Sequence, residues 1–186
     1  MLREWLSERL SGMFVSEIEI ERSQNDLNII LKTSRPGILI GRGGEGVEKL
    51  KNEIQKFAKK FNLSSPKNFK VSVEEIRQPE THAKIVSQMV AEDLEKRMPF
   101  RRVLKHTIEK VISSRDVKGV KISLSGRLDG AEMARYEWLK RGQIPLTTLR
   151  ADIDFARERA HLPYGDLGIK VWIYKGEVFT KKQEVK

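Results

Sequence analysis

The feature that most constrains the fold is a glycine-rich loop between two apolar segments. Residues 41–44 read Gly-Arg-Gly-Gly, after the apolar residues 38–40 and before a long amphipathic stretch. Glycine lets the backbone turn tightly and approach another chain, because no Cβ intervenes. The free N–H groups and positive dipole end of the helix that follows favour phosphate, and the arginine adds positive charge. The residues that we predict to contact a nucleic-acid backbone are Gly41, Arg42, Gly43 and Gly44.

Two other interpretations of these glycines stay open at this stage. Gly41, Gly43 and Gly46 also fit the spacing of the dinucleotide-binding fingerprint, with Glu74 as the ribose-binding acid. That fit is poor, because the fingerprint follows a strand, whereas only residues 37–40 separate a proline from the loop. The acid also lies about 28 residues beyond the last glycine, where about 20 is expected. For any single glycine, the remaining alternative is a turn without a ligand.

Apolar periodicity predicts the elements around the loop. We expect a helix over residues 2–13, strands over 15–22 and 26–33 joined by a turn at 23–25, a short helix, the glycine loop, a helix from 47 to about 61, a break at 64–66 and a strand over 69–74. This order resembles the type II, or prokaryotic, KH module. In KH modules the Gly-x-x-Gly loop clamps about four backbone nucleotides of RNA.

A second domain is expected after the probable boundary at Gln78-Pro79. We expect helices over residues 86–94 and 100–112, then strands over 120–124, 132–141, 151–155 and 168–174, the 132–141 segment being ambiguous by periodicity. Two helices followed by a mainly antiparallel sheet make an α+β domain. The sequence therefore predicts a type II KH RNA-binding domain over residues 1–78 and a C-terminal α+β domain over residues 79–186.

The helix expected from Phe100 carries basic residues off its apolar side. Its buried side is expected to hold Phe100, Val103, Leu104, Ile108, Val111 and Ile112. The residues left to project outward are Arg101, Arg102 and Lys105, which neighbour one another on the helix surface. Taken alone, they are explained slightly better as a solvated basic face partnered with Glu109.

Composition supports a nucleic-acid partner. The chain has 36 Lys and Arg against 26 Asp and Glu, a net charge of +10 and a pI of about 9.8. A domain pI above about 9 is the electrostatic footprint of proteins that neutralise phosphates. Residues 1–77 hold 14 basic and 11 acidic side chains, and residues 78–186 hold 22 and 15. Because most of the excess lies downstream of the KH-like part, we expect a second binding surface there.

Several functional classes are disfavoured. The absence of cysteine excludes disulfides, zinc knuckles built on Cys and thiol catalysis. His82, His106 and His161 show no metal-ligand spacing, so we expect no metal and no cofactor. No apolar run approaches the ~18 residues of a membrane span, and the charged start of the chain does not resemble a signal peptide. We therefore expect a soluble intracellular protein with no membrane partner and no small-molecule substrate.

Six sequence blocks resemble the bacterial form of the small-subunit ribosomal protein S3 family. They span residues 35–44, 100–105, 119–128, 130–135, 145–154 and 168–176, and they occur in the family's order over nearly the whole chain. The resemblance implies a structural, RNA-binding role in the head of the small subunit, beside the channel through which mRNA enters. The family's Arg-Arg-x-x-Lys motif, linked to opening mRNA structure, matches Arg101, Arg102 and Lys105.

The resemblance also implies partners. These are small-subunit ribosomal RNA, mRNA and neighbouring proteins of the subunit head, in the cytoplasm, with an organellar ribosome as the open alternative. The candidate ribosomal-RNA contacts are Arg127, Arg135, Lys140, Arg141 and Arg150. Among the tryptophans, Trp138 is the better candidate for an RNA contact, because basic residues surround it in sequence.

The chain departs from the family pattern at two places. Bacterial members carry about 40 further N-terminal residues that touch ribosomal RNA, whereas this sequence starts at the first helix of the KH domain, by natural reduction or as a fragment. Asp129 stands where the family usually has a small residue.

Two competing functions remain. An enzyme could use Asp152 and Asp154, but no His or nucleophile lies near them in sequence, so we expect salt-bridge roles and no catalysis. The other is a free-standing KH regulator of RNA. Co-sedimentation with the small subunit would separate these from a ribosomal role.

Overall fold

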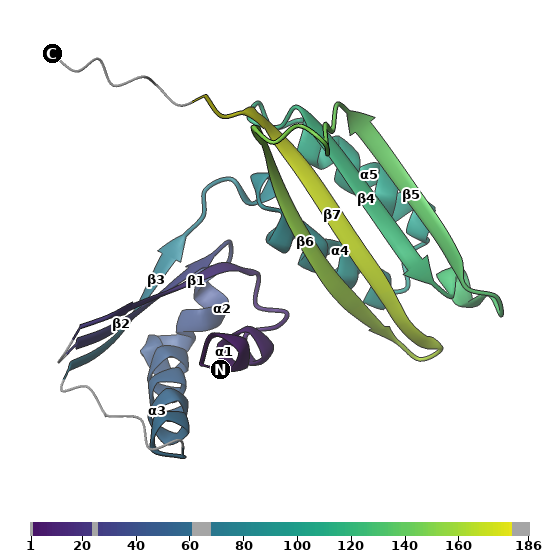
Figure 1. The fold of residues 1–186 in the computed structure, drawn as a ribbon. Coiled ribbons are helices and arrows are strands. Elements are labelled where there is room, and N and C mark those ends of the chain that lie inside the picture. Colours follow the sequence, from purple (N-terminus) through teal and green to yellow (C-terminus); the bar gives the residue numbers. More distant parts are fainter. Residues whose placement is uncertain (1, 24–25, 61–67, 180–186) are drawn as a thin grey trace, which may run out of the picture. The chain divides into compact units, whose positions relative to one another are not determined.

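The computed structural model describes residues 2–23, 26–60 and 68–179 (Figure 1). The chain divides into two compact units, Met1–Gln78 and Pro79–Lys186. The turn expected at residues 23–25 lies partly outside the described residues, and the helix break expected at residues 64–66 lies wholly outside them.

The first unit is a three-stranded sheet with helices on one face (Figure 1). Its elements are α1 (Leu2–Arg9), β1 (Val15–Arg22), β2 (Asp26–Thr33), α2 (Pro36–Ile40), α3 (Glu45–Lys60) and β3 (Asn68–Glu75). The strand order is β1-β2-β3, with β2 antiparallel to β1 and parallel to β3. The fully buried Ile29 and Leu31 of β2 pack against Leu6, Leu50 and Ile54 of α1 and α3.

The second unit is a four-stranded antiparallel sheet covered on one face by two helices (Figure 1). Its elements are α4 (Ala83–Glu95), α5 (Phe100–Ile112), β4 (Gly119–Gly126), β5 (Arg135–Gly142), β6 (Ala151–Leu162) and β7 (Gly165–Glu177). The strand order is β5-β4-β7-β6. Alternate residues of β4, namely Val120, Ile122 and Leu124, are fully buried under the helices. The two units together confirm the predicted α+β fold class.

The long β6–β7 hairpin exceeds the predicted strands at 151–155 and 168–174. The prediction missed its far half because the side of β6 under α4 carries few large apolar residues. Ala156 and Ala160 are buried there, and small side chains let the helix approach closely. Between them lies Glu158, which forms an ion pair with Lys84 of α4 at 2.6 Å. The far half of β6 therefore lacks hydrophobic alternation, because small residues and an ion pair form its contacts with α4.

Two smaller expectations were wrong. The first helix ends at Arg9 rather than running to residue 13, although Leu10 is still buried in the core. Strand β5 begins at Arg135 rather than at residue 132. On this strand Leu139 packs against the core, whereas Trp138, whose side chain is 47% exposed, faces away from it. The aromatic residues Tyr136 and Trp138 are therefore on the side of the strand that faces away from the core.

Candidate nucleic-acid interface

The glycine loop connects α2 to α3 through a single 3-10 turn, Arg42–Gly44. Gly41, Gly43 and Gly44 have φ angles of 67°, 61° and 86°, which L side chains rarely adopt. No heavy atom lies within 4 Å of where a Cβ of Gly43 or Gly44 would stand. The loop backbone is therefore open to a close approach by another chain. Because the loop follows a helix rather than a strand, the dinucleotide interpretation fails.

Gly46 has a structural role in helix packing, which the sequence analysis did not identify. A Cβ at this position would stand 2.3 Å from the carbonyl oxygen of Leu39 and 3.0 Å from that of Ile40. The first turn of α3 therefore packs directly on the end of α2. The missing side chain of Gly46 thus permits the close contact between α2 and α3 that brings the two ends of the glycine loop together.

The surroundings of the loop combine charge and exposed apolar surface. Arg42 is exposed and forms no ion pair with any described residue. Glu45 begins α3 and pairs with Lys49 at 2.6 Å; the hydrogen bond from this lysine lowers the pKa of the carboxyl group. Ile38 is 51% exposed on α2 beside the loop. The pairing of Glu45 reduces its repulsion of a phosphate at the helix N-terminus.

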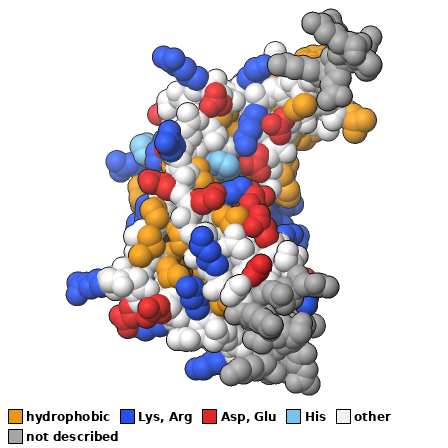
Figure 2. Space-filling model, turned by 90° about the vertical axis from the view of Figure 1, so that its left-hand side faces the viewer, with side chains coloured by type: hydrophobic (Ala, Val, Ile, Leu, Met, Phe, Trp, Pro, Cys, Tyr) orange, Lys and Arg blue, Asp and Glu red, His pale blue; other side chains and the backbone are white. Residues whose placement is uncertain are grey.

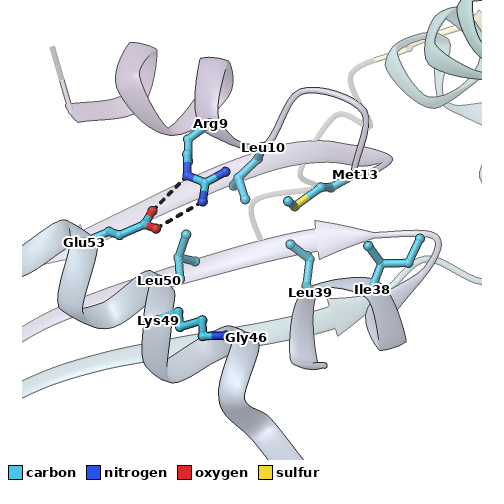
Figure 3. A pocket seen from close by; sticks show the side chains of 9 residues that line it. All are labelled: Arg9, Leu10, Met13, Ile38, Leu39, Gly46, Lys49, Leu50 and Glu53. Carbon is cyan, nitrogen blue, oxygen red and sulfur yellow. Dashed lines mark hydrogen bonds and ion pairs between the residues drawn. The ribbon is translucent and has the colours of Figure 1, made fainter. Parts of the chain in front are cut away.

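A hollow of about 150 Å³ lies between α1, α2 and α3 (Figure 3). Leu10, Leu39 and Leu50 line it, and Arg9 and Glu53 lie at one end. Arg9 donates two parallel hydrogen bonds to Glu53, at 2.9 and 3.0 Å, and these lower the pKa of the carboxyl group and raise that of the guanidinium.

The basic residues predicted on α5 project from the core as expected from helical geometry. Phe100, Val103, Leu104, Thr107, Ile108 and Val111 are buried, and Ile112 is partly buried. The exposed residues Arg101, Arg102 and Lys105, hereafter the α5 cluster, lie on the other side. The expected pairing with Glu109 is absent, because none of the ion pairs found among the described residues joins this carboxylate to the α5 cluster.

The position of the α5 cluster on its helix is electrostatically unfavourable. Arg101 and Arg102 occupy the first turn of α5, which contains no acidic residue and is preceded by Pro99 as the N-cap. The N-terminus of a helix already carries a partial positive charge, so cations there reduce helix stability. Helix stability therefore does not explain why cations occupy the first turn of α5, whereas binding of an anionic ligand there would explain it.

The five candidate ribosomal-RNA contacts fall into two groups. Arg127 donates hydrogen bonds to the carbonyl oxygens of Ala131 and Tyr164, at 2.8 and 3.3 Å, and Arg150 pairs with Glu177 at 2.6 Å. Both guanidinium groups are thus engaged within the protein. Arg135, Lys140 and Arg141 are exposed along β5, which is an edge strand of the sheet.

The two remaining residues that the sequence singled out have local explanations. Asp154 accepts a hydrogen bond from the backbone N–H of Ala83 at 2.9 Å, so it caps the N-terminus of α4 from across the sheet. Asp129 has φ 54°, a left-handed conformation that Asp adopts more readily than most residues. Sequence gave no signal for the first contact, because it joins residues 71 positions apart.

Within the described part of the chain, no three His, Asp or Glu side chains gather as a metal site would require. None of the described helices is both long and apolar enough to span a membrane.

Family comparisons match both units. A model of the KH domain matches residues 1–81, and a model of the C-terminal domain of ribosomal protein S3 matches residues 90–173. The small ribosomal subunit protein uS3 of Pseudomonas paraeruginosa is 46% identical over 183 residues, 98% of this chain and 77% of that protein. The uS3 protein of Endomicrobium trichonymphae is 48% identical over 180 residues, 97% of this chain and 74% of that protein.

A KH fold joined to an S3-type C-terminal domain defines a class of ribosomal proteins with an RNA-binding module. The chain belongs to the uS3 family of small ribosomal subunit proteins. The resemblance drawn from the six sequence blocks is thereby confirmed.

Proposed function

We propose that the protein is a structural constituent of the small ribosomal subunit that binds ribosomal RNA, and that its α5 cluster contacts incoming mRNA and helps to open it. Family membership supports the ribosomal part of this proposal. The α5 cluster supports the mRNA part, together with the match of its three residues to the family motif.

One observation carries the mRNA part. Three exposed cations stand at the N-terminal half of a helix whose opposite side is core, and they have no carboxylate partner among the described residues. Phosphate oxygens would meet both the side-chain charges and the positive end of the helix dipole. A surface that binds single-stranded RNA more tightly than duplex shifts the local pairing equilibrium towards the open form.

The glycine loop is the proposed ribosomal-RNA contact of the first unit. Its open backbone, its positive φ angles and the unpaired Arg42 suit a close approach to phosphates. The exposed cations of β5, namely Arg135, Lys140 and Arg141, are the candidates in the second unit.

The mRNA part is tested by replacing Arg101, Arg102 and Lys105 with alanine in ribosomes that carry no other copy of the protein. Because these charges oppose the helix dipole, folding should be unchanged or stabilised by about 0.3–1 kcal/mol for each charge removed from the first turn. Subunit incorporation should stay normal. Translation should slow on messages with a stable hairpin downstream and not on unstructured messages.

A matched control replaces Lys96, Lys110 and Arg115, three cations of the same helical layer outside the α5 cluster. Two of them form exposed ion pairs, with Glu92 and Glu80, which contribute little to stability. The control should translate both kinds of message like the parent. Equal translation of both messages by the α5 variant would make its three residues ordinary surface charge.

The alternative is a free-standing KH regulator. Sedimentation of cell extract on a sucrose gradient distinguishes the two, because a structural constituent migrates with the small subunit at high salt. A protein found mainly in the free fraction would favour the regulator.

A further inference from the structure

The sheet of the second unit has an open face, opposite α4 and α5, of which the proposed function uses only the edge residue Lys140. Strand pairing places its outward residues in three rows that each cross β5, β4, β7 and β6. The rows are Lys140–Lys121–Trp172–Phe155, then Trp138–Ser123–Lys170–Arg157, then Tyr136–Ser125–Gly168–Arg159. We call these twelve positions the open face. They include five cations and four aromatic residues, and none of the twelve is acidic.

The aromatic residues of the open face lie together and are incompletely covered. Trp138 and Phe155 are 47% and 49% exposed, and the rings of Phe155 and Trp172 lie 5.2 Å apart. The Lys121 ammonium lies between the two indoles, 5.1 Å from the Trp138 ring and 5.2 Å from the Trp172 ring. A cation near both indole rings favours fixed orientations of the two side chains.

A basic hollow of about 350 Å³ adjoins the aromatic residues. Its lining includes three cations, Arg157 and Arg159 of β6 and Lys170 of β7, one carboxylate, Glu158, which is paired with Lys84, and also His161, Gly168 and Ile169. A Cβ on Gly168 would stand 2.8 Å from the Ser125 hydroxyl oxygen, so a side chain there would displace the serine side chain of the neighbouring strand. The three cations have no ion-pair partner among the described residues.

Internal stability does not account for this arrangement. Exposed aromatic surface gains nothing from burial, and adjacent unpaired cations repel one another. On the helix-covered side of the same strands, by contrast, charges are paired: Lys84 with Glu158, and Lys175 with Asp154. Around the aromatic rows, the open side thus carries cations without carboxylate partners, whereas these two ion pairs lie on the packed side.

We propose that the open face is a binding platform for single-stranded RNA, separate from the α5 cluster and the glycine loop. Unpaired bases stack on Trp138 and Phe155, and the phosphates between them meet Arg157, Arg159 and Lys170. Stacking on exposed aromatic rings requires bases that are not paired, so duplex RNA is a poor ligand. The two carboxylates nearest these cations, Glu158 and Asp166, are already paired with Lys84 and His161, so the excess of cations favours a polyanion over a protein partner.

The test uses the full chain with the other proposed surfaces neutralised by Arg42→Ala, Arg101→Ala, Arg102→Ala and Lys105→Ala. Affinity for a fluorescein-labelled 12-nucleotide oligouridine is measured by anisotropy across a salt series. In this background, Trp138→Leu with Phe155→Leu should weaken binding at least tenfold, because each stacked base contributes substantially. The salt dependence should not change, because no phosphate contact is lost.

The cations give a second and different signature. Arg157→Gln with Lys170→Gln should reduce the slope of log K against log salt by about 1.4, since each single-strand phosphate contact contributes about 0.7. The matched controls are Leu146→Ala with Leu149→Ala, which remove exposed apolar surface elsewhere in the unit, and Lys96→Gln with Arg115→Gln on the helical side. Neither control should change affinity or slope appreciably.

Circular dichroism and thermal melting establish that each variant folds. Folded open-face variants that bind the oligonucleotide like the background protein would overturn the proposal, as would an equal loss in the controls. Unchanged RNA affinity with lost incorporation into subunits would instead identify a protein-docking surface and overturn it too. None of these results bears on the α5 cluster, which is already neutralised in the background.

Discussion

The two sheets of this protein differ most in the side chains that they leave uncovered. In the first unit, the strand register places four glutamates and two lysines on the side away from the helices: Glu17, Glu19, Glu21, Glu74, Lys32 and Lys70. In the second unit, the corresponding side is the open face, whose twelve positions hold five cations, four aromatic residues and no carboxylate, while Asp166 in the next row is paired with His161. Both sheets bury one side under helices, so packing alone does not explain this difference.

The first sheet neutralises its own charge. Lys32 forms ion pairs with Glu19 and Glu17, and their hydrogen bonds raise the pKa of the ammonium group. The remaining glutamates would repel a phosphate backbone. Among the described residues, the first unit therefore has the glycine loop as its proposed RNA contact, whereas the second unit has the α5 cluster and the open face.

The comparison shows why net charge does not locate a binding surface. Figure 2 shows Lys and Arg interspersed with Asp and Glu over the face in view, rather than gathered in one continuous patch. The useful distinction is between cations that have carboxylate partners and cations that have none.

The largest effect is expected where the first unit depends on close backbone packing. Gly46→Ala should destabilise this unit by about 3 kcal/mol, because its Cβ would overlap the Leu39 carbonyl oxygen. Gly43→Ala should cost only about 1–2 kcal/mol, from its φ of 61° alone. Urea unfolding of the two variants measures the difference. Equal losses would mean that the helix contact at Gly46 relaxes freely.

The difference between the two sheets can be tested by giving the uncovered side of the first sheet a positive charge without a change in fold. Glu17→Lys, Glu19→Lys and Glu21→Lys together would give it a basic face. We expect a gain in oligouridine affinity of about tenfold at low salt and a steeper salt dependence. The Glu→Gln triple variant serves as the control and should gain less. No gain in the lysine variant would show that aromatic stacking, which this sheet lacks, is indispensable.

The smallest effect concerns pH and the Arg9–Glu53 pair. The pKa of Glu53 lies below its ordinary 4.5, because Arg9 donates hydrogen bonds to the carboxylate. Its contribution to stability is thus present above pH 4.5 and is lost as the pH falls through the lowered pKa. Glu53→Gln should lower Tm by about 1–4 °C at pH 7 and by nothing near pH 2. A Tm difference that persists at pH 2 would exclude this explanation.

Much of the fold follows from sequence periodicity because apolar residues there record burial directly. The α5 helix is the clearest case: the spacing of Val103, Leu104 and Ile108 predicted both its buried side and the exposure of the α5 cluster. Strand β6 is the opposite case, since Ala156 and Glu158 carry its packing and have no hydrophobic signature. Periodicity records the burial of large apolar side chains and misses packing made by small or charged ones.

The candidate site was predictable to a similar extent. The glycine loop and the α5 cluster are contiguous in sequence, so motifs and helical spacing were enough to propose them as RNA contacts. The open face is not contiguous, because Lys121, Trp138, Phe155 and Trp172 come from four strands and meet only through their register. For the same reason, the capping of α4 by Asp154 could not be read from the chain.

The most direct test of where RNA lies on this protein is photo-crosslinking of the full chain to single-stranded RNA containing 4-thiouridine, with the crosslinked peptides identified by mass spectrometry. We predict crosslinks in the glycine loop, at the start of α5 and on Trp138, Phe155 or Trp172, with none in β1. Crosslinks concentrated on the glutamate-bearing side of β1 and β2, with none in the second unit, would contradict the account.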